Sequence, residues 1–296
     1  MNTLDKLKHD PVNRRAFLQR MGAAGLGVAA IALLDGCGGG NGNGQGPAKT
    51  IAPGSTNPNT NPTGQPVVGN FPVRLPGNNQ NEQVLNFALT LEILEADLYR
   101  QALNIASGKA ITSPLSNSPS DYTLNVGAGG INSAAGFAYL RDFAFVEAAH
   151  RDFLQAVIPD NVEVKRNPNG YTFGPLAPPA NPTLKDLLTS LYPLEEEGVS
   201  AYLGAAPFIT DLGILQTAVT IYSTEARHSA AIAYILGLDT GPSPAPAAGV
   251  GARQSVVLQG NALPARGPNN ESSKPNVFEY FIPPTTVVQN ITPLLR

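Results

Sequence analysis

The feature that most constrains the fold of this chain is a short motif that occurs twice, a glutamate three residues before a histidine. The copies are Glu147 and His150 in the string E-A-A-H, and Glu225 and His228 in the string E-A-R-H. Residues three apart lie on one face of a helix, one turn above the other. Each pair can therefore point at a single ion. The remaining histidine, His9, lies in the N-terminal leader described below.

Both motifs interrupt an apolar stripe of helical spacing. Around the first motif, steps of three or four residues give Leu140, Phe143, Glu147, His150, Leu154 and Val157. Around the second, the same steps give Ala218, Ile221, Glu225, His228, Ile232 and Ile235. A lone Glu-x-x-His is most often a solvated salt bridge, but here the apolar neighbours place both pairs on the core side of a helix.

Apolar periodicity predicts four helices, over about 82–106, 133–158, 184–206 and 210–237. Pro193 falls inside the third helix and is expected to kink or split it. The third and fourth helices are joined by only a few residues and should pack antiparallel. About 24 residues separate the second helix from the third, which is long enough for the chain to cross the bundle. The stretch at 107–132 is interpreted as a surface insertion.

The first and third helices each carry an inward carboxylate in a matching position. Glu92 and Glu195 both follow leucines on the apolar face, and both precede a tyrosine by seven residues, Tyr99 and Tyr202. Each is followed downstream by its own Glu-x-x-His, so the domain consists of two helix pairs of matching design. Glu95 also falls near the inward face, but the shared spacing to tyrosine favours Glu92.

The remaining tyrosines and glutamates near these positions allow more than one interpretation. Tyr99, Tyr202 and Tyr222 are either packed core residues with a satisfied hydroxyl or donors to a ligand carboxylate. The expectation for Glu95, Glu196 and Glu197 is that they are solvated.

Four carboxylates in one apolar core would each cost several kcal/mol and would repel one another. Two divalent cations carry the charge that offsets them. The set resembles the ligand arrangement of dimetal carboxylate bundles, a glutamate from each of two helices and Glu-x-x-His from each of the others. The predicted fold is all-α, a ferritin-like four-helix bundle with one long crossover. The predicted metal ligands are Glu92, Glu147, His150, Glu195, Glu225 and His228.

The first 37 residues indicate export. Arg14 and Arg15 precede an apolar run at 21–34, which is shorter than the ~20 residues that span a bilayer. This pattern resembles a twin-arginine (Tat) translocation signal. Cys37, the only cysteine, ends the string L-D-G-C, which resembles a lipoprotein cleavage box whose cysteine carries the lipid. Asp35 is unusual in such a box, so cleavage by the ordinary signal peptidase is the alternative. We expect a periplasmic protein or one lipid-anchored to the cell envelope.

Composition divides the rest of the chain. Residues 38–80 are rich in Gly, Asn, Pro, Thr and Gln and are predicted to be a flexible linker. The bundle is expected at 81–238, followed by a Pro-rich C-terminal extension at 239–296 in which only the string V-F-E-Y-F-I is expected to pack. A net charge of −3 does not provide the basic surface that nucleic-acid binding requires. The expected partners are metal ions and a small oxidant, with membrane contact only through a lipid.

About half of the chain, roughly residues 82–238, resembles the ferritin-like domain family found in exported bacterial proteins and plant desiccation-related proteins. The resemblance lies in the strings L-N-F-A-L-T-L-E-I-L-E-A-D-L-Y, F-V-E-A-A-H-R-D-F-L, L-E-E-E-G-V-S-A-Y-L-G-A-A-P and Y-S-T-E-A-R-H-S-A-A-I. The tail near 277–293 resembles the segment that comes after the bundle in such proteins. The resemblance implies a di-iron or di-manganese centre. In it Glu147 and Glu225 would bridge the ions, with Glu92 and His150 completing one site and Glu195 and His228 the other.

Two functions are compatible with this resemblance. The first is an oxidoreductase that oxidises Fe²⁺ with O₂ or dismutates H₂O₂, and its carboxylate-rich ligands suit iron or manganese. The second is a non-enzymatic envelope protein, a bundle held together by metal that binds a partner or protects under drying stress. Fold analogy is a weak guide to the reaction, and the sequence predicts no oligomeric state.

Overall fold

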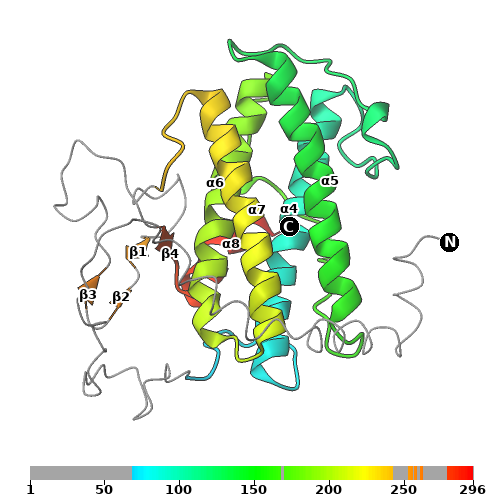
Figure 1. The fold of residues 1–296 in the computed structure, drawn as a ribbon. Helices are drawn as coiled ribbons and strands as arrows, with labels where there is room; N and C mark the ends of the chain where they lie inside the picture. Colours follow the sequence, from blue (N-terminus) through cyan, green and yellow to red (C-terminus); the bar gives the residue numbers. More distant parts are fainter. Residues whose placement is uncertain are drawn as a thin grey trace, which may run out of the picture. The chain divides into compact units, whose positions relative to one another are not determined.

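The computed structural model describes residues 69–167, 170–242, 253–255, 257–258, 261–262 and 279–295. Four long helices, α4 to α7, lie side by side and form a bundle (Figure 1). The predictions for the twin-arginine leader, for Cys37 and for most of the linker fall outside the described residues. Within the described residues, none of the helices combines the length and the apolar character that a membrane span needs.

The predicted all-α fold is confirmed. The bundle helices are α4 (Gln80–Ala106), α5 (Ser133–Val157), α6 (Leu184–Ala205) and α7 (Leu212–Leu236). Each begins where a side chain accepts a hydrogen bond from an otherwise unpaired amide of the first turn. These capping residues are Asn79, Asn132, Thr183 and Asp211. The last helix ends at Gly237, whose φ of 72° lies in the left-handed region that glycine adopts most easily.

Pro193 does not split its helix. α6 is continuous from Leu184 to Ala205, and Pro193 is buried within it. A proline removes one backbone hydrogen bond and crowds the preceding turn. The packing of the buried turns on either side of Pro193 offsets this loss, so of the two expected alternatives, a kink or a split, the split does not occur.

The long connection between α5 and α6 crosses the bundle alongside α4. Three contacts mark its path from the start of α4 towards its end: Val164 with Asn86, Arg166 with Asp97, and Tyr171 with Gln101. α4 packs mainly against α5, and α6 packs mainly against α7. The crossover makes α5 and α6 run in the same direction, while α7 returns antiparallel to α6 (Figure 1).

Short helical turns complete the connections: η1 (Pro119–Asp121), η2 (Gly174–Leu176), η3 (Ala206–Phe208) and η4 (Thr292–Leu294). The insertion at 107–132 is fastened to the bundle by Tyr122, which is buried, and by the amide of Asn125, which donates to the carbonyl of Ala106 at 2.7 Å. The core between the four helices is apolar, with Leu89, Leu140 and Leu188 fully buried. Burial of each such side chain stabilises the fold by about 2 kcal/mol.

The C-terminal segment forms two small antiparallel ribbons. β1 (Gln254–Ser255) pairs with β4 (Tyr280–Phe281), and β2 (Val257–Leu258) pairs with β3 (Asn261–Ala262). β4 leads into α8 (Pro284–Ile291). Both β4 and α8 lie against α6.

More of the tail packs than the sequence predicted. Val287 and Ile291 of α8 are buried beside α6, in addition to Tyr280 and Ile282 of the predicted string, whose first two residues lie outside the described residues. Pro284 does not prevent this helix because a proline is tolerated in the first helical turn. The approach is close: a Cβ atom at Gly204 would lie 2.0 Å from the carbonyl oxygen of Ile282, so only glycine allows the contact.

Candidate metal centre

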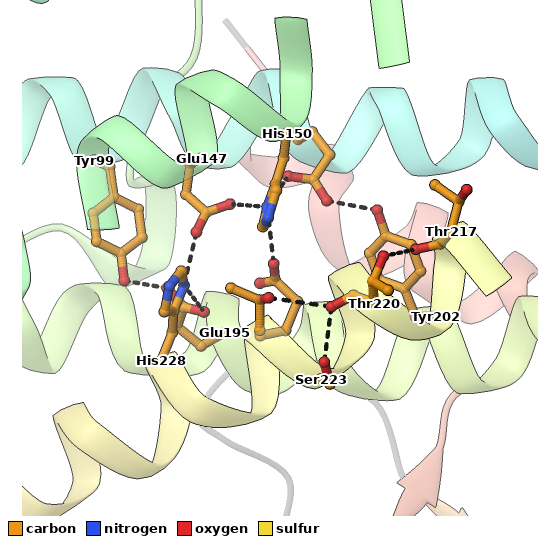
Figure 2. Close-up of polar contacts among 12 residues, drawn as sticks. Tyr99, Glu147, His150, Glu195, Tyr202, Thr217, Thr220, Ser223 and His228 are labelled. Carbon is orange, nitrogen blue, oxygen red and sulfur yellow. Dashed lines mark hydrogen bonds and ion pairs between the residues drawn. The ribbon is translucent and has the colours of Figure 1, made fainter. Parts of the chain in front are cut away.

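Side chains from all four helices converge in the middle of the bundle (Figure 2). They are Glu92 from α4, Glu147 and His150 from α5, Glu195 from α6, and Glu225 and His228 from α7. They offer two groups of ligand atoms, and within each group the atoms lie within 4.8 Å of one another. One group is Glu92, Glu147, His150 and Glu225, and the other is Glu147, Glu195, Glu225 and His228. The structure therefore brings together all six residues that the sequence singled out as ligands.

Two carboxylates, those of Glu147 and Glu225, belong to both groups. Glu147 lies between the two histidines (Figure 2). Its Oε2 atom is 3.2 Å from Nδ1 of His150, and its Oε1 atom is 2.8 Å from Nδ1 of His228. The Oε1 atom of Glu225 is 3.3 Å from Nδ1 of His150. The centre thus consists of two adjoining groups of ligand atoms that share the carboxylates of Glu147 and Glu225.

The other two carboxylates each belong to one group. The Oε2 atom of Glu92 lies 3.4 Å from Nδ1 of His150, and the Oε2 atom of Glu195 lies 3.5 Å from Nδ1 of His228. The ring of Phe143 stacks on that of His228 with their centroids 3.8 Å apart, which limits how the imidazole can turn. Each histidine therefore faces one carboxylate of its own group and at least one shared carboxylate.

The cluster is closed to water and short of hydrogen bonds. All four glutamates are fully buried, and His150 is the most exposed of the six, at 16 % of its side chain. Several atoms form no hydrogen bond of good geometry with the described residues: Glu92 Oε2, Glu147 Oε1, Glu195 Oε2, both Glu225 oxygens and His228 Nδ1. Of these, Glu147 Oε1 and His228 Nδ1 face each other as an ion pair. Buried polar atoms without partners are costly. Cations between the carboxylates would satisfy these atoms, so the donor set fits metal ions.

The chemistry of the donors agrees with this fit. Each group presents three carboxylates and one imidazole. Oxygen-rich sets with a single nitrogen suit iron or manganese better than soft, thiolate-seeking metals.

The family is decided by a match over the same helices. A model of the ferritin-like domain family matches residues 80–238, which is more than half of the chain. The chain belongs to the ferritin-like domain family. The match begins at the first residue of α4 and ends two residues after α7, so the ferritin-like domain coincides with the four-helix bundle. A comparison with curated proteins gave no match.

Two tyrosines of the ferritin-like domain hold ligand carboxylates across the bundle. Tyr99 on α4 donates its hydroxyl hydrogen to Oε1 of Glu195 on α6. Tyr202 on α6 donates to Oε1 of Glu92 on α4, at 2.6 Å. The two lie at opposite ends of the cluster (Figure 2). The repeated Glu-to-Tyr spacing is therefore a crossed pair, in which each helix orients the glutamate of the other.

For Tyr222, the structure supports the first of the two interpretations, a side chain packed against the core. No hydrogen bond joins its hydroxyl to the six cluster residues in the described part of the chain. Instead, burial and the nearby carboxylate of Glu279 raise its pKa to about 12. The hydroxyl of Tyr222 therefore lies near the carboxylate of Glu279 in the tail.

Glu95, which the sequence placed near the inward face but did not count as a ligand, lies in the core. Predicted to be solvated, it is only 2 % exposed, and its Oε2 atom has no hydrogen-bond partner among the described residues. A Cβ atom at Gly198 of α6 would lie 3.3 Å from Oε1 of Glu95 and 3.1 Å from Oε2 of Glu225. Glu95 is thus a fifth carboxylate beside the cluster. The available signal was its position three residues after Glu92, on the same helix face.

Glu196 and Glu197 were also predicted to be solvated, and both are buried. Glu196 pairs with Arg253 and accepts a hydrogen bond from Ser229. Glu197 accepts from Nδ2 of Asn290 at 3.0 Å, and burial raises its pKa to about 7. Their partners come largely from the C-terminal tail, so these carboxylates fasten the tail and do not join the metal centre.

Burial and mutual contacts shift the pKa values of the cluster in opposite directions. Burial raises the pKa of Glu92 to about 7 and raises that of Glu225 well above its ordinary value. Burial would lower the pKa of His228, but the charge of Glu195 and contacts with Glu147 outweigh it and raise this pKa to about 9. Burial would raise the pKa of Glu147, but hydrogen bonds with His150 and His228 outweigh it and lower this pKa to about 2.

The crossed tyrosines lead to a first prediction. Tyr99→Phe removes the donor to Glu195, and Tyr202→Phe removes the donor to Glu92. Each change is expected to weaken metal binding by about 10- to 100-fold, because the carboxylate loses the contact that orients it. Competition with a coloured chelator measures the affinity. Tyr222→Phe is the matched control and should bind as the unmodified protein does. Equal affinities in all three variants would show that the tyrosines only fill space.

The pKa shifts lead to a second prediction, for the metal-free protein. The pKa of Glu92 rises from 4.5 to about 7 on folding, and that of His228 from 6.5 to about 9. At pH values between the unfolded and the folded pKa of each group, the folded state binds more protons than the unfolded state. The free energy of unfolding therefore falls as the pH rises. The lowered pKa of Glu147 has the opposite effect: it makes the free energy of unfolding rise with pH, but only below about pH 4.5.

Urea unfolding of the metal-free protein across this range measures the effect. The free energy of unfolding should decrease from about pH 5 to about pH 9. An increase over that range would show that the cluster does not hold its protons in the folded state.

Proposed function

We propose that the bundle binds two divalent ions of iron or manganese next to each other and uses them in redox chemistry with O₂ or H₂O₂. The observation that supports this most strongly is the sharing of Glu147 and Glu225 between two groups of ligand atoms. A carboxylate common to both groups can contact two cations at once. Two cations also carry the charge that offsets four buried carboxylates.

Each residue has a defined task in this proposal. Glu92 and His150 would hold one ion, Glu195 and His228 would hold the other, and Glu147 and Glu225 would serve both. Tyr99 and Tyr202 keep the two unshared glutamates in place through their hydroxyl hydrogens. The surrounding leucines exclude water from the cluster. The ions, when bound, would supply one-electron redox chemistry towards a small oxidant.

Two reactions are compatible with this centre. Oxidation of two Fe²⁺ to two Fe³⁺ by one O₂ consumes two protons and releases one H₂O₂. Dismutation converts two H₂O₂ into two H₂O and one O₂. Both reactions need a small oxidant to reach a buried centre, and neither requires a large substrate site.

Metal stoichiometry provides the third prediction and the direct test. The purified protein, loaded without oxygen, should bind two Fe²⁺ or Mn²⁺ per chain. Glu147→Gln removes a shared ligand and should weaken the binding of both ions. Glu195→Gln should weaken the binding of one ion and leave the other bound. Asp142→Asn is the control, because Asp142 lies on the same helix as Glu147 and is exposed. Metal analysis after dialysis measures the number of ions.

The number of bound ions and the turnover of O₂ or H₂O₂ distinguish the oxidoreductase from the non-catalytic alternative. One ion per chain, or equal loss in both glutamate variants, would contradict the shared arrangement. Two ions together with O₂ uptake on Fe²⁺ addition, or O₂ release from H₂O₂, would support the oxidoreductase. Two ions without turnover would support the alternative, a bundle that is stabilised by metal and acts in the envelope without catalysis.

We also propose export through the twin-arginine route with a lipid on Cys37, and this is the fourth prediction. Arg14→Lys together with Arg15→Lys should leave the protein in the cytoplasm, because the paired arginines are the recognised feature of such signals. Lys8→Gln is the control for a basic residue outside the pair. Cys37→Ala should abolish labelling by a fatty acid. Unchanged envelope localisation of the double-arginine variant would exclude this route.

A further inference from the structure

An apolar pocket opens beside one half of the metal centre. It has a volume of about 420 Å³ counted out to its mouth in solvent, and its walls come from α4, α5, α6 and α7. Three of its lining residues lie one helical turn from a cluster residue: Ala88 from Glu92, Leu154 from His150, and Ile221 from Glu225. One turn advances an α-helix by about 5.4 Å. All three cluster residues belong to the same ligand group.

Tyr202 is the wall between this pocket and the cluster. Its side chain lines the pocket, and its hydroxyl donates to Oε1 of Glu92 at 2.6 Å. Figure 2 shows Tyr202 at the end of the cluster where Thr217 of α7 also lies. The pocket therefore adjoins the half of the centre that contains Glu92 and His150.

The lining offers little to a polar molecule. Its hydroxyl groups are those of Tyr202 and Thr217, and the other lining side chains, all within the described part of the chain, are hydrocarbon. Tyr202 donates to Glu92, and Thr217 donates to the carbonyl of Gly213 at 2.9 Å. Both hydroxyl hydrogens are thus engaged. Water or H₂O₂ would lose hydrogen bonds on entering, whereas apolar cavities stay dry and take up apolar guests such as xenon.

The space is narrow as well as apolar. Its walls leave room for about one or two molecules of the size of water. A diatomic molecule matches this space.

We propose that this pocket is an antechamber for dioxygen, which it admits in preference to H₂O₂ and holds beside the Glu92 and His150 half of the centre. The inference rests on the proposed function and narrows it, because it identifies O₂ as the oxidant. Three observations support it together: the position one turn from three cluster residues, the lack of an unengaged donor on the lining, and the diatomic size.

Xenon tests the pocket without any metal, since it is apolar and binds where small apolar molecules bind. In the metal-free full chain, methyl NMR signals of Ala88 and Ile221 should shift as the xenon pressure rises. Ala218→Leu fills the pocket from α7 and should abolish these shifts. Ala231→Leu is the matched control, a half-buried alanine on the same helix outside the lining. The absence of xenon-dependent shifts in the unmodified protein would overturn the proposal.

Kinetics then test the preference for dioxygen. Relative to Ala231→Leu, Ala218→Leu should slow Fe²⁺ oxidation by O₂ about tenfold, equivalent to a barrier about 1.4 kcal/mol higher. The same reaction driven by H₂O₂ should keep its rate. An equal decrease with both oxidants, or with neither, would overturn the preference. Ala218→Val provides a smaller filling if the leucine variant does not fold.

Xenon binding and metal binding distinguish failure of the pocket from failure of the metal centre. A protein that binds xenon in the pocket but binds no metal would contradict the proposed function and leave the apolar pocket established. A protein that binds two ions but no xenon would retain the metal centre and lose the antechamber.

Discussion

The structure depends on one constraint, the burial of several carboxylates in a single apolar core. Glu92, Glu147, Glu195 and Glu225 are fully buried, and Glu95 lies next to them. An ionised carboxylate removed from water costs several kcal/mol unless an opposite charge is close. In the metal-free protein, protons on the histidines and on some carboxylates supply part of that charge. Cations can replace these protons, so metal binding, proton release and folding stability are coupled.

The two halves of the bundle are related in design but not identical. The pairs α4 with α5 and α6 with α7 each contribute one glutamate, one Glu-x-x-His and one tyrosine that reaches across to the other pair. The two pairs differ three residues after Glu92 and Glu195, where α4 has Glu95 and α6 has Gly198. A side chain at Gly198 would press on Glu95 and Glu225. The apolar pocket lies next to the Glu92 and His150 group, so we expect unequal access to the two ligand groups.

The tail explains why several predictions about α6 were wrong. A bundle helix usually leaves one face in water, and Glu196 and Glu197 would occupy such a face. In this protein α8 and β4 cover it, and both glutamates are paired with side chains of the tail or of α7. These partners are separated from α6 by many residues, and Arg253 and Asn290 carry no pattern that links them to it. Local periodicity could predict that α6 is a helix, but not that it is buried on nearly every side.

The sequence by itself determined the four helices and the six cluster residues, because these follow from local rules. Apolar spacing defines which face of a helix is buried, and two Glu-x-x-His motifs on such faces predict a shared centre. The family resemblance implied that Glu147 and Glu225 are shared, and the structure places both of them in the two ligand groups. Only the tertiary structure decided that Tyr99 and Tyr202 cross between helices, that Glu95 joins the core, and where the apolar pocket lies. These features depend on how far each helix is shifted and rotated against its neighbours. Contacts between distant segments set those shifts, and the period of one helix contains no information about them.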